Sequence, residues 1–441
     1  MKYFIPVFLV LFIYAPVSGQ TDSMVVPIER LVTTLVEQSP VFGSAAVGFA
    51  LYDPAADTFM CTSQADRFYV PASNQKLLTL FLSNRLLRDG MTVAAYRKRP
   101  GGGWDVWPQA YPLCLHPDFR DYDELTPWLA KLDAGPIYLH LADQPPRYGS
   151  GWCWDDYNGG YMTERSLLPL YGNRAWFNKE VNHVLTTLPD TFARRLVYES
   201  TYEGWLERDE YQNTFTFGPR LARAGEFEFS RGVAYGPELI GQLLTDTLGR
   251  EIRVGKLPLP GGVSFLRVPV PDTLYRAFMK NSDNYLGEQL LLACSAARYG
   301  KVDIDKIVEY AEAQMDGLLG NDRGPQWVDG SGLSRYNLVS PRQLIFVLDS
   351  LLTDLGEERL FSILPTGGRD GTLRRRYAGD PEPYVFAKTG TLSNTIALSG
   401  GLRCRSGRLL LFSLLINNAT EPTTPYYQET ERLLRFIRDS Y

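Results

Sequence analysis

Three short motifs follow one another along this chain of 441 residues, and each contains side chains that could take part in acyl transfer. In chain order they are Ser73-Asn74-Gln75-Lys76, Ser282-Asp283-Asn284 and Lys388-Thr389-Gly390. Each motif alone recurs by chance in long chains, whereas all three in this order form a specific pattern. Ser282 lies 209 residues after Ser73, which is an unusually wide separation. The chemistry that Ser and Lys support together is nucleophilic attack by an activated hydroxyl.

Ser73 and Lys76 form a nucleophile and a base at a predicted helix start. Residues three apart on a helix share one face, so the two side chains lie within reach of each other. Lys76 can act as a base only when it is neutral, and at an ordinary pKa roughly one Lys in 10³ is neutral at pH 7. Burial and a second cation lower the pKa of an amine, and Lys388 is the candidate second cation. Taken alone, the pair could instead be a helix N-cap followed by a solvated Lys.

The second motif precedes an apolar run over 285–297 that predicts a helix. Taken alone, this motif would also be an N-cap cluster. Beside the first motif, Ser282 could relay a proton to a leaving amine, and Asn284 could bind both Lys76 and a substrate amide. We expect Asp283 to point away from them and to have a structural role.

The third motif follows the short apolar run 384–387 and predicts an edge strand beside the cleft. Such a strand can pair with a peptide substrate. Lys388 and Thr389 would bind a carboxylate, and Gly390 would let the substrate backbone approach closely. The N–H group of Thr391 would complete an oxyanion hole. The alternative for this motif alone is a Thr-Gly turn with a surface Lys.

Hydrophobic periodicity predicts the elements that must position these side chains. We expect helices over 28–38, 73–86, 274–279, 285–297 and 429–440, and strands over 45–52, 57–62, 396–403 and 408–416. The helix that begins at Ser73 is apolar nearly all round and should be buried in a core. Strands flanked by terminal helices predict an α+β fold in which helices sandwich an antiparallel sheet.

Composition divides the chain into parts. From about residue 93 to about 260 it is rich in Trp, Tyr, Pro and Gly and has poor periodicity, which indicates an inserted module. We therefore predict a signal peptide over 1–19, a catalytic domain formed by 20–92 plus 261–441, and inserted domain material over 93–260. The signal prediction depends on Lys2, an apolar stretch and small residues before Gln20. An exported or periplasmic protein without a stable membrane anchor follows from it.

Charge and metal-ligand patterns exclude several functions. A net charge of −5 gives no sign of nucleic-acid binding. The three histidines show no paired-ligand spacing, so we expect neither a metal nor a cofactor, and no Ser-His-Asp triad. The five cysteines are scattered and do not make a disulfide framework, although Cys114 and Cys153 could pair.

With these motifs the sequence resembles the D-alanyl-D-alanine carboxypeptidase/endopeptidase family of the penicillin-binding protein 4 type, the class C low-molecular-mass penicillin-binding proteins. The resemblance covers roughly 40–95 and 230–441. Further matching segments are Asp329-Gly330-Ser331-Gly332-Leu333-Ser334-Arg335, Leu364-Pro365, Asp370-Gly371-Thr372-Leu373 and Gly151-Trp152-Cys153-Trp154-Asp155-Asp156. The family places its extra domain material between the first two motifs, which explains their wide separation.

The resemblance implies a serine β-lactamase/DD-peptidase-like transpeptidase fold with a large insert. It also implies a penicillin-binding serine D-Ala-D-Ala carboxypeptidase/endopeptidase that acts on peptidoglycan stem peptides and is inhibited covalently by β-lactam antibiotics. Catalytic roles then fall to Ser73, Lys76, Ser282, Asn284 and Lys388, and substrate binding to Thr389, Gly390, Thr391 and Asp155. The Asp-Gly-Ser-Gly segment is expected to be a structural turn.

Two alternatives remain open at this point. One is a β-lactamase or esterase on the same scaffold, although no Glu-x-x-Leu-Asn pattern that would activate a deacylating water stands between Ser282 and Lys388. The other is a non-catalytic wall-binding protein, which would have no need of an intact set of catalytic side chains. Carboxypeptidase and endopeptidase action both cut after a D-Ala carbonyl, and the sequence does not separate them.

Overall fold

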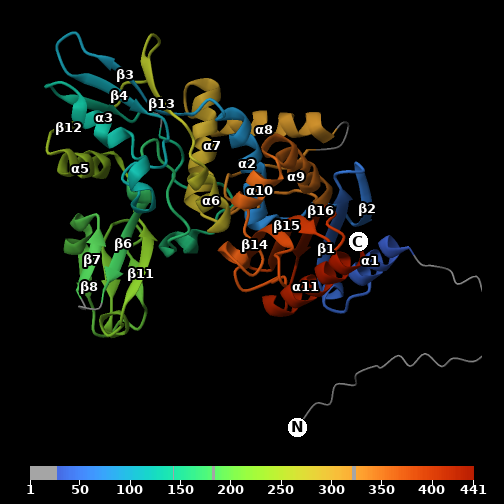
Figure 1. Ribbon diagram of the computed structural model, residues 1–441. Coiled ribbons are helices and arrows are strands. Elements are labelled where there is room, and N and C mark those ends of the chain that lie inside the picture. Colours follow the sequence, from blue (N-terminus) through green and yellow to red (C-terminus); the bar gives the residue numbers. More distant parts are fainter. Residues whose placement is uncertain (1–26, 143, 181–183, 320–323) are drawn as a thin grey trace, which may run out of the picture.

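The computed structural model describes residues 27–142, 144–180, 184–319 and 324–441. The predicted signal over 1–19 lies outside the described residues. One region consists of helices packed on both faces of a sheet, and a second region with three further sheets lies beside it (Figure 1). Within the described residues, no helix is both long enough and apolar enough to cross a membrane.

A five-stranded antiparallel sheet forms the centre of the first region, with strand order β14-β15-β16-β1-β2. Its strands are β1 (Ala46–Asp53), β2 (Thr58–Ser63), β14 (Val385–Leu392), β15 (Thr395–Arg403) and β16 (Leu409–Asn417). The predicted pairing of β1 with β2 and of β15 with β16 is confirmed. The third motif lies on β14 at the edge of the sheet, as expected.

Helices cover both faces of this sheet. α1 (Ile28–Glu37) packs with α11 (Thr423–Ser440) on one face, and α9 (Pro341–Leu355) packs on the other face together with α2 (Gln75–Leu86) (Figure 1). The remaining helices of this region are α6 (Asp272–Lys280), α7 (Asn284–Tyr299), α8 (Ile304–Leu319) and α10 (Glu357–Ile363). The predicted α+β arrangement, a sheet sandwiched by helices, is confirmed.

The second region contains three sheets of short strands. The first has the order β12-β5-β4-β3-β13, with β4, β5 and β12 parallel and the other pairs antiparallel. Its strands are β3 (Met91–Lys98), β4 (Trp104–Pro108), β5 (Ile137–His140), β12 (Ile252–Gly255) and β13 (Ser264–Val268), and α3 (Leu125–Lys131) and α5 (Pro237–Leu248) accompany them. The domain division of the chain at 93 and 260 stays a prediction.

The other two sheets have three strands each, in the orders β11-β6-β7 and β8-β10-β9. They comprise β6 (Arg174–Lys179), β7 (Leu185–Leu188), β8 (Leu196–Tyr198), β9 (Leu206–Arg208), β10 (Phe215–Phe217) and β11 (Phe227–Gly232), with the short helix α4 (Pro219–Ala222). Short 3₁₀ helices complete the described part: η1 (Phe42–Ser44), η2 (Ala72–Asn74), η3 (Pro117–Tyr122), η4 (Trp154–Asn158), η5 (Tyr171–Asn173), η6 (Asp190–Arg195) and η7 (Gly371–Leu373).

Hydrophobic contacts connect the two regions. One cluster of buried side chains runs from α2 and α7 into strands β3 to β5. A separate, smaller cluster lies under the sheets of β6 to β11. Because the first cluster is shared, the five-stranded sheet of the second region packs directly on the helices that carry the first two motifs. We call this second region the inserted region below.

Three details differ from expectation. The helix predicted to begin at Ser73 begins at Gln75, because the 3₁₀ turn η2 comes first. α11 begins at Thr423 rather than 429, since Pro425 is tolerated in a first helical turn. The suggested Cys114–Cys153 disulfide is not formed; all five cysteines are described and are free thiols.

Candidate active site

The first motif lies on a tight turn between β2 and α2. Ala72 has a φ of +47°, and Ser73 follows it in η2. Two glycines allow other segments to pack against this turn. A Cβ on Gly332 would lie 1.9 Å from the carbonyl oxygen of Ala72, and a Cβ on Gly390 would lie 3.0 Å from the backbone nitrogen of Ser73. The loop after α8 and the edge strand β14 therefore hold the nucleophile in place from two sides.

Lys76 is fully buried in the first turn of α2. Its Nζ lies 3.0 Å from Ser73 Oγ, 2.6 Å from Asn284 Oδ1 and 2.5 Å from the carbonyl oxygen of Ser331. The amide of Asn284 is oriented by a second hydrogen bond, in which its Nδ2 donates to the carbonyl oxygen of Tyr161 at 3.0 Å. The first two motifs therefore meet at one amine.

This set of partners determines where the Lys76 lone pair points. A neutral amine has two N–H donors and one lone pair, and the oxygens of Asn284 and Ser331 can only accept. When both N–H groups are used there, the lone pair is left for the Ser73 hydroxyl. The geometry therefore suits removal of the Ser73 proton by Lys76.

Burial lowers the pKa of Lys76 to about 8, against the opposing effect of the carboxylates of Asp329, Asp283 and Glu288. Lys388 is also fully buried, and burial together with the positive charge of Lys76 holds its pKa well below the usual range. The expected second-cation effect thus acts on Lys388, whereas burial is the main cause at Lys76. A substantial fraction of Lys76 is neutral near pH 8.

Ser282 and Lys388 are in direct contact. Ser282 has a φ of +56° in the turn between α6 and α7, and its Oγ accepts a hydrogen bond from Lys388 Nζ at 2.8 Å. The same Nζ donates to the carbonyl oxygen of Thr389 at 2.7 Å. Since the Ser282 oxygen accepts from Lys388, its own hydroxyl proton is free to be donated. The second and third motifs are thus brought together as well.

The other residues of the third motif line the edge of the sheet. Thr389 Oγ1 donates to Thr372 Oγ1 at 2.7 Å, and the exposed Thr391 hydroxyl lies 2.8 Å from that of Tyr427. Gly390 was expected to give room to a substrate backbone. The atoms that a Cβ would meet here include the carbonyl oxygen of Pro71, at 2.8 Å, so this glycine also gives room to the protein's own nucleophile turn.

Asp283 points away from the cleft, as expected. It is the N-cap of α7 and accepts from the Leu286 N–H at 3.0 Å. Arg174 on β6 binds its carboxylate through two hydrogen bonds of 3.0 and 3.2 Å. Burial alone would raise the pKa of Asp283, but Arg174 and the Leu286 N–H lower it on balance. A residue of the inserted region therefore anchors the second motif.

The Asp329-to-Arg335 segment forms the wall behind Lys76, a role larger than the structural turn we expected. Asp329 accepts hydrogen bonds from the backbone N–H groups of Gly332 and Ser334 at 2.8 and 2.6 Å, and from the indole of Trp152 at 2.8 Å. The Ser331 carbonyl of this loop is one of the three partners of Lys76.

Asp155 lies in η4 and is exposed, unlike the buried lysines. We call this exposed position the rim of the site. Its neighbour Asp156 accepts a hydrogen bond from the Tyr161 hydroxyl at 2.6 Å. The Tyr161 carbonyl oxygen in turn accepts from Asn284. Asp156, which is half-buried beside the exposed Asp155, is therefore linked to the second motif through one residue, Tyr161.

Two buried residues were missed by reasoning from the sequence. Glu288 accepts hydrogen bonds from the loop that carries Ser331, and Arg165 binds Glu288. A signal existed for Glu288, because it is a charged residue in an apolar helix, four residues after Asn284. Arg165 lies in a stretch without periodicity, and nothing in the sequence marks it.

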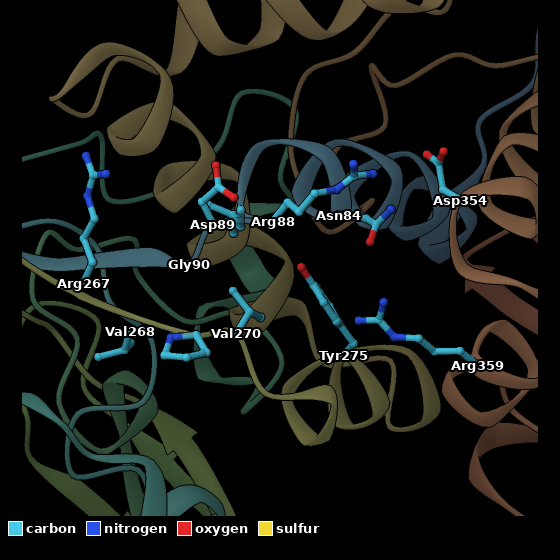
Figure 2. A pocket seen from close by; sticks show the side chains of 12 residues that line it. Asn84, Arg88, Asp89, Gly90, Arg267, Val268, Val270, Tyr275, Asp354 and Arg359 are labelled. Carbon is cyan, nitrogen blue, oxygen red and sulfur yellow. The ribbon is translucent and has the colours of Figure 1, made fainter.

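A pocket of about 630 Å³ lies elsewhere, at the far end of α2 (Figure 2). The Tyr275 hydroxyl points into it, and Arg88, Arg267 and Arg359 are among its lining residues. Arg359 is bound to Asp272. None of the predicted site residues lines this pocket, so it is separate from the three motifs.

Comparison with known proteins identifies relatives of this chain. The model of the D-Ala-D-Ala carboxypeptidase 3 (S13) family matches residues 142–432, a range that contains the second and third motifs. The D-alanyl-D-alanine carboxypeptidase DacB of Haemophilus influenzae is 30% identical over 325 residues, which cover 66% of this chain and 67% of that protein. A D-alanyl-D-alanine carboxypeptidase of Actinomadura sp. is 33% identical over 151 residues, 33% of this chain and 28% of that protein.

Among solved structures, penicillin binding protein 4 (dacB) from Haemophilus influenzae matches with a TM-score of 0.72 and 21% sequence identity, covering 92% of this chain and 99% of that chain. A second structure of that protein, complexed with a novel beta-lactam, matches with a TM-score of 0.70 and 20% identity over the same shares of the two chains. The predicted fold, that of the DD-peptidases with a large insert, is confirmed.

Proposed function

The chain belongs to the D-Ala-D-Ala carboxypeptidase 3 (S13) family, and on this premise we propose that it is an exported enzyme that cleaves peptidoglycan stem peptides after a D-Ala carbonyl, through an acyl-enzyme on Ser73. Its class, a serine-type D-Ala-D-Ala carboxypeptidase, is the one predicted from the sequence. The observation that carries the proposed mechanism is the set of three partners around Lys76 Nζ.

In the first step Lys76 takes the Ser73 proton, and Ser73 Oγ forms a bond to the D-Ala carbonyl carbon. The negative charge then develops on the carbonyl oxygen. We assign its stabilisation to the backbone N–H groups of Ser73 and Thr391, since a preorganised donor of this kind typically contributes about 3–4 kcal/mol to transition-state binding.

In the second step the C–N bond breaks and the leaving amine needs a proton. The Ser282 hydroxyl can supply that proton, and Lys388, at 2.8 Å from Ser282 Oγ, can replace it. In a carboxypeptidase reaction the leaving group is a free D-amino acid, whose carboxylate we assign to Lys388 and Thr389. Cleavage of a cross-link by the same steps would release a longer amine. Lys76 must then release to solvent the proton that it took from Ser73, after which the neutral amine again acts as the base while water hydrolyses the ester.

β-Lactam antibiotics are expected to react as substrate mimics that acylate Ser73 and leave slowly. This part of the proposal is supported by the matching structure with a bound beta-lactam. Export is supported by the composition of residues 1–19. Comparing the mass of the chain recovered outside the cytoplasm with that of the full-length chain tests removal of this segment.

The decisive experiment is to incubate the purified protein with labelled benzylpenicillin and to map the modified peptide by mass spectrometry. The label is expected on the peptide that contains Ser73, and Ser73→Ala should abolish labelling. Release of D-Ala from a synthetic D-Ala-D-Ala peptide should be lost in the same variant. Undiminished labelling of Ser73→Ala would refute the assignment of the nucleophile.

A further inference from the structure

An ion pair between the inserted region and α7 lies behind the catalytic lysine. Arg165 and Glu288 have side chains that are each only 3% exposed. Arg165 Nε donates to Glu288 Oε2 at 2.7 Å. The guanidinium also lies over the ring of Trp152, 5.2 Å from its centroid. A buried pair of this kind is stable only when both charges are kept together and hydrogen-bonded.

The other oxygen of Glu288 holds the loop that contacts Lys76. Glu288 Oε1 accepts the backbone N–H groups of Ser331 at 2.8 Å and Gly330 at 3.1 Å. The carbonyl oxygen of the same Ser331 accepts from Lys76 Nζ. Asn284 lies one helical turn before Glu288, so α7 presents two residues to the lysine, one directly and one through the loop.

Close backbone packing brings the loop onto α7. A Cβ on Gly287 would lie 2.9 Å from the carbonyl oxygen of Gly330, and a Cβ on Gly330 would lie 2.2 Å from that of Gly287. The loop therefore lies in direct backbone contact with α7, and its position depends on the helix and on the Glu288 carboxylate.

We propose that Arg165 and Glu288 are positioning residues, which hold the Ser331 carbonyl against Lys76 and thereby make the inserted region part of the catalytic apparatus. The inference rests on the proposed function, because it concerns the residue assigned there as the base. Arg165 acts through Glu288, Glu288 acts through Ser331, and neither touches the reacting atoms.

The pair also acts through charge. The carboxylates whose charge raises the pKa of Lys76 are Asp283 at the N-cap of α7, Glu288 within α7 and Asp329 on the loop. Lys388 faces it from β14. Burial raises the pKa of Glu288, and Arg165 opposes this effect. Loss of the Glu288 charge removes one of the three groups that raise the pKa of Lys76.

The test is the pH dependence of acylation by benzylpenicillin in the full chain. Glu288→Gln removes the charge, so neutral Lys76 should persist to lower pH. The acidic limb of the profile of acylation rate against pH should therefore move to lower pH. Arg165→Met leaves Glu288 buried without its counter-charge, and such a carboxyl takes up a proton near neutral pH. It should therefore shift the limb in the same direction and slow acylation by up to about 10²-fold, as expected for a misplaced catalytic group. Arg165→Lys should restore most of the rate.

A matched control is available in the same region. Arg147 also binds a buried carboxylate, that of Glu164, whose oxygens otherwise accept hydrogen bonds from the Tyr148 hydroxyl and the Tyr235 N–H rather than from the loop that contacts Lys76. Arg147→Met should leave the acidic limb in place. The double variant Arg165→Met/Glu288→Gln contains no unpaired buried charge and keeps an acceptor for the loop, so it tests the limb even if a single variant does not fold.

The outcomes separate the two proposals. If the wild-type protein is acylated on Ser73 but the double variant and Arg165→Met both keep the wild-type limb and rate, the positioning role is refuted and the proposed function stands. The same conclusion holds if Arg147→Met shifts the limb equally. If the wild-type protein is not acylated on Ser73, the proposed function itself fails.

Discussion

The two regions of the molecule contribute to the site in different ways. The helices, the antiparallel sheet and the turns beside them supply every group that we assign to bond making or breaking. The two lysines are fully buried, Ser73 and Ser282 are half-buried, and these groups lie close to one another. The inserted region supplies an exposed rim at Asp155 and two arginines, Arg165 and Arg174, that bind carboxylates of α7.

The comparison teaches that an insertion can belong to an active site without touching the reaction. Both arginines bind a carboxylate on α7 or at its N-cap, and each acts on the reacting groups only through that carboxylate. Arg165 acts through Glu288, and Arg174 acts through Asp283. If the two regions differ in this way, substitutions of the catalytic residues in the first region should directly slow acylation. Changes in the second region should alter stability, pH dependence or substrate preference.

The largest effect is expected at Lys76. Lys76→Arg keeps the positive charge but removes the base, because Arg stays protonated in proteins. We expect acylation by benzylpenicillin to fall by at least about 10³-fold, as is usual when a group that acts with the nucleophile is removed. The rate of labelling at saturating antibiotic measures this.

The matched control is Lys131→Arg, an exposed lysine on α3 in the inserted region. It should react at the wild-type rate. Near-normal acylation of Lys76→Arg, in a variant whose thermal unfolding shows it to be folded, would transfer the role of base to another residue, and the division between the regions would have to be redrawn.

The next effect concerns Arg174, whose replacement should reduce stability. Arg174→Met leaves Asp283 in place with its side chain only 18% exposed and without its partner. Breaking a buried pair in this way typically costs about 3 kcal/mol or more in the free energy of unfolding. Chemical denaturation of the wild-type protein and the variant at pH 7 measures the difference.

The pH dependence of the stability difference tests whether the lost interaction is electrostatic. The pKa of Asp283 is lowered in the folded protein, so its pairing stabilises the fold above the ordinary carboxyl pKa of about 4 and is lost as the pH falls further. The gap between wild type and Arg174→Met should therefore narrow in acid. Arg194→Met, on the exposed face of η6, should show almost no change at any pH. A gap that stays constant down to pH 3 would mean that packing, not charge, is lost.

The same contrast explains how much of the fold could be predicted. Periodicity located α1, α7, β15 and β16 to within a few residues, because one repeating pattern decides burial along each of them. In the inserted region the strands β8, β9 and β10 are three residues each, too short for a period to be visible. Its sheets are held together by contacts between distant segments, such as the pairing of β3 with β13.

The residues of the site could likewise be predicted only where a local sequence pattern marks them. Ser73, Lys76, Ser282, Asn284 and Lys388 could be chosen because short motifs mark them, and the structure brings them together. Arg165 could not be chosen, since its role depends on Glu288, 123 residues later in the chain. The charge coupling of the two lysines was foreseen, but not that burial would dominate at Lys76.

A smaller effect is expected at Lys388. Lys388→Met removes the proposed partner of the substrate carboxylate, and charge-assisted hydrogen bonds of this kind are worth about 1.5–3 kcal/mol, or roughly 10- to 150-fold in KM. Because burial is the main cause of the low pKa of Lys76, the acidic limb at saturating antibiotic should stay near pH 8. An upward shift of this limb would show instead that Lys388 carries a charge in the free enzyme and holds the pKa of Lys76 down.

The smallest effect is expected at the rim. Asp155 is exposed, and it adjoins Asp156, which is linked to Asn284 through Tyr161. Attraction between exposed charges is worth about 1 kcal/mol at most, which corresponds to roughly fivefold in KM. Asp155→Asn should therefore raise KM about that much for stem peptides with a free side-chain amine near the scissile bond, and leave acylation by benzylpenicillin unchanged.

Three comparisons make the rim prediction specific. The effect should disappear when the amine of the peptide is acetylated, and it should weaken as salt screens the two charges. Asp121→Asn, an exposed carboxylate of η3 in the same inserted region, should leave KM unchanged for both peptides. If Asp155→Asn raised KM equally for the free and the acetylated peptide, the rim would act by shape rather than by charge. If it slowed acylation by benzylpenicillin as well, Asp155 would belong with the catalytic groups of the first region, and the contrast between the two regions would fail at this residue.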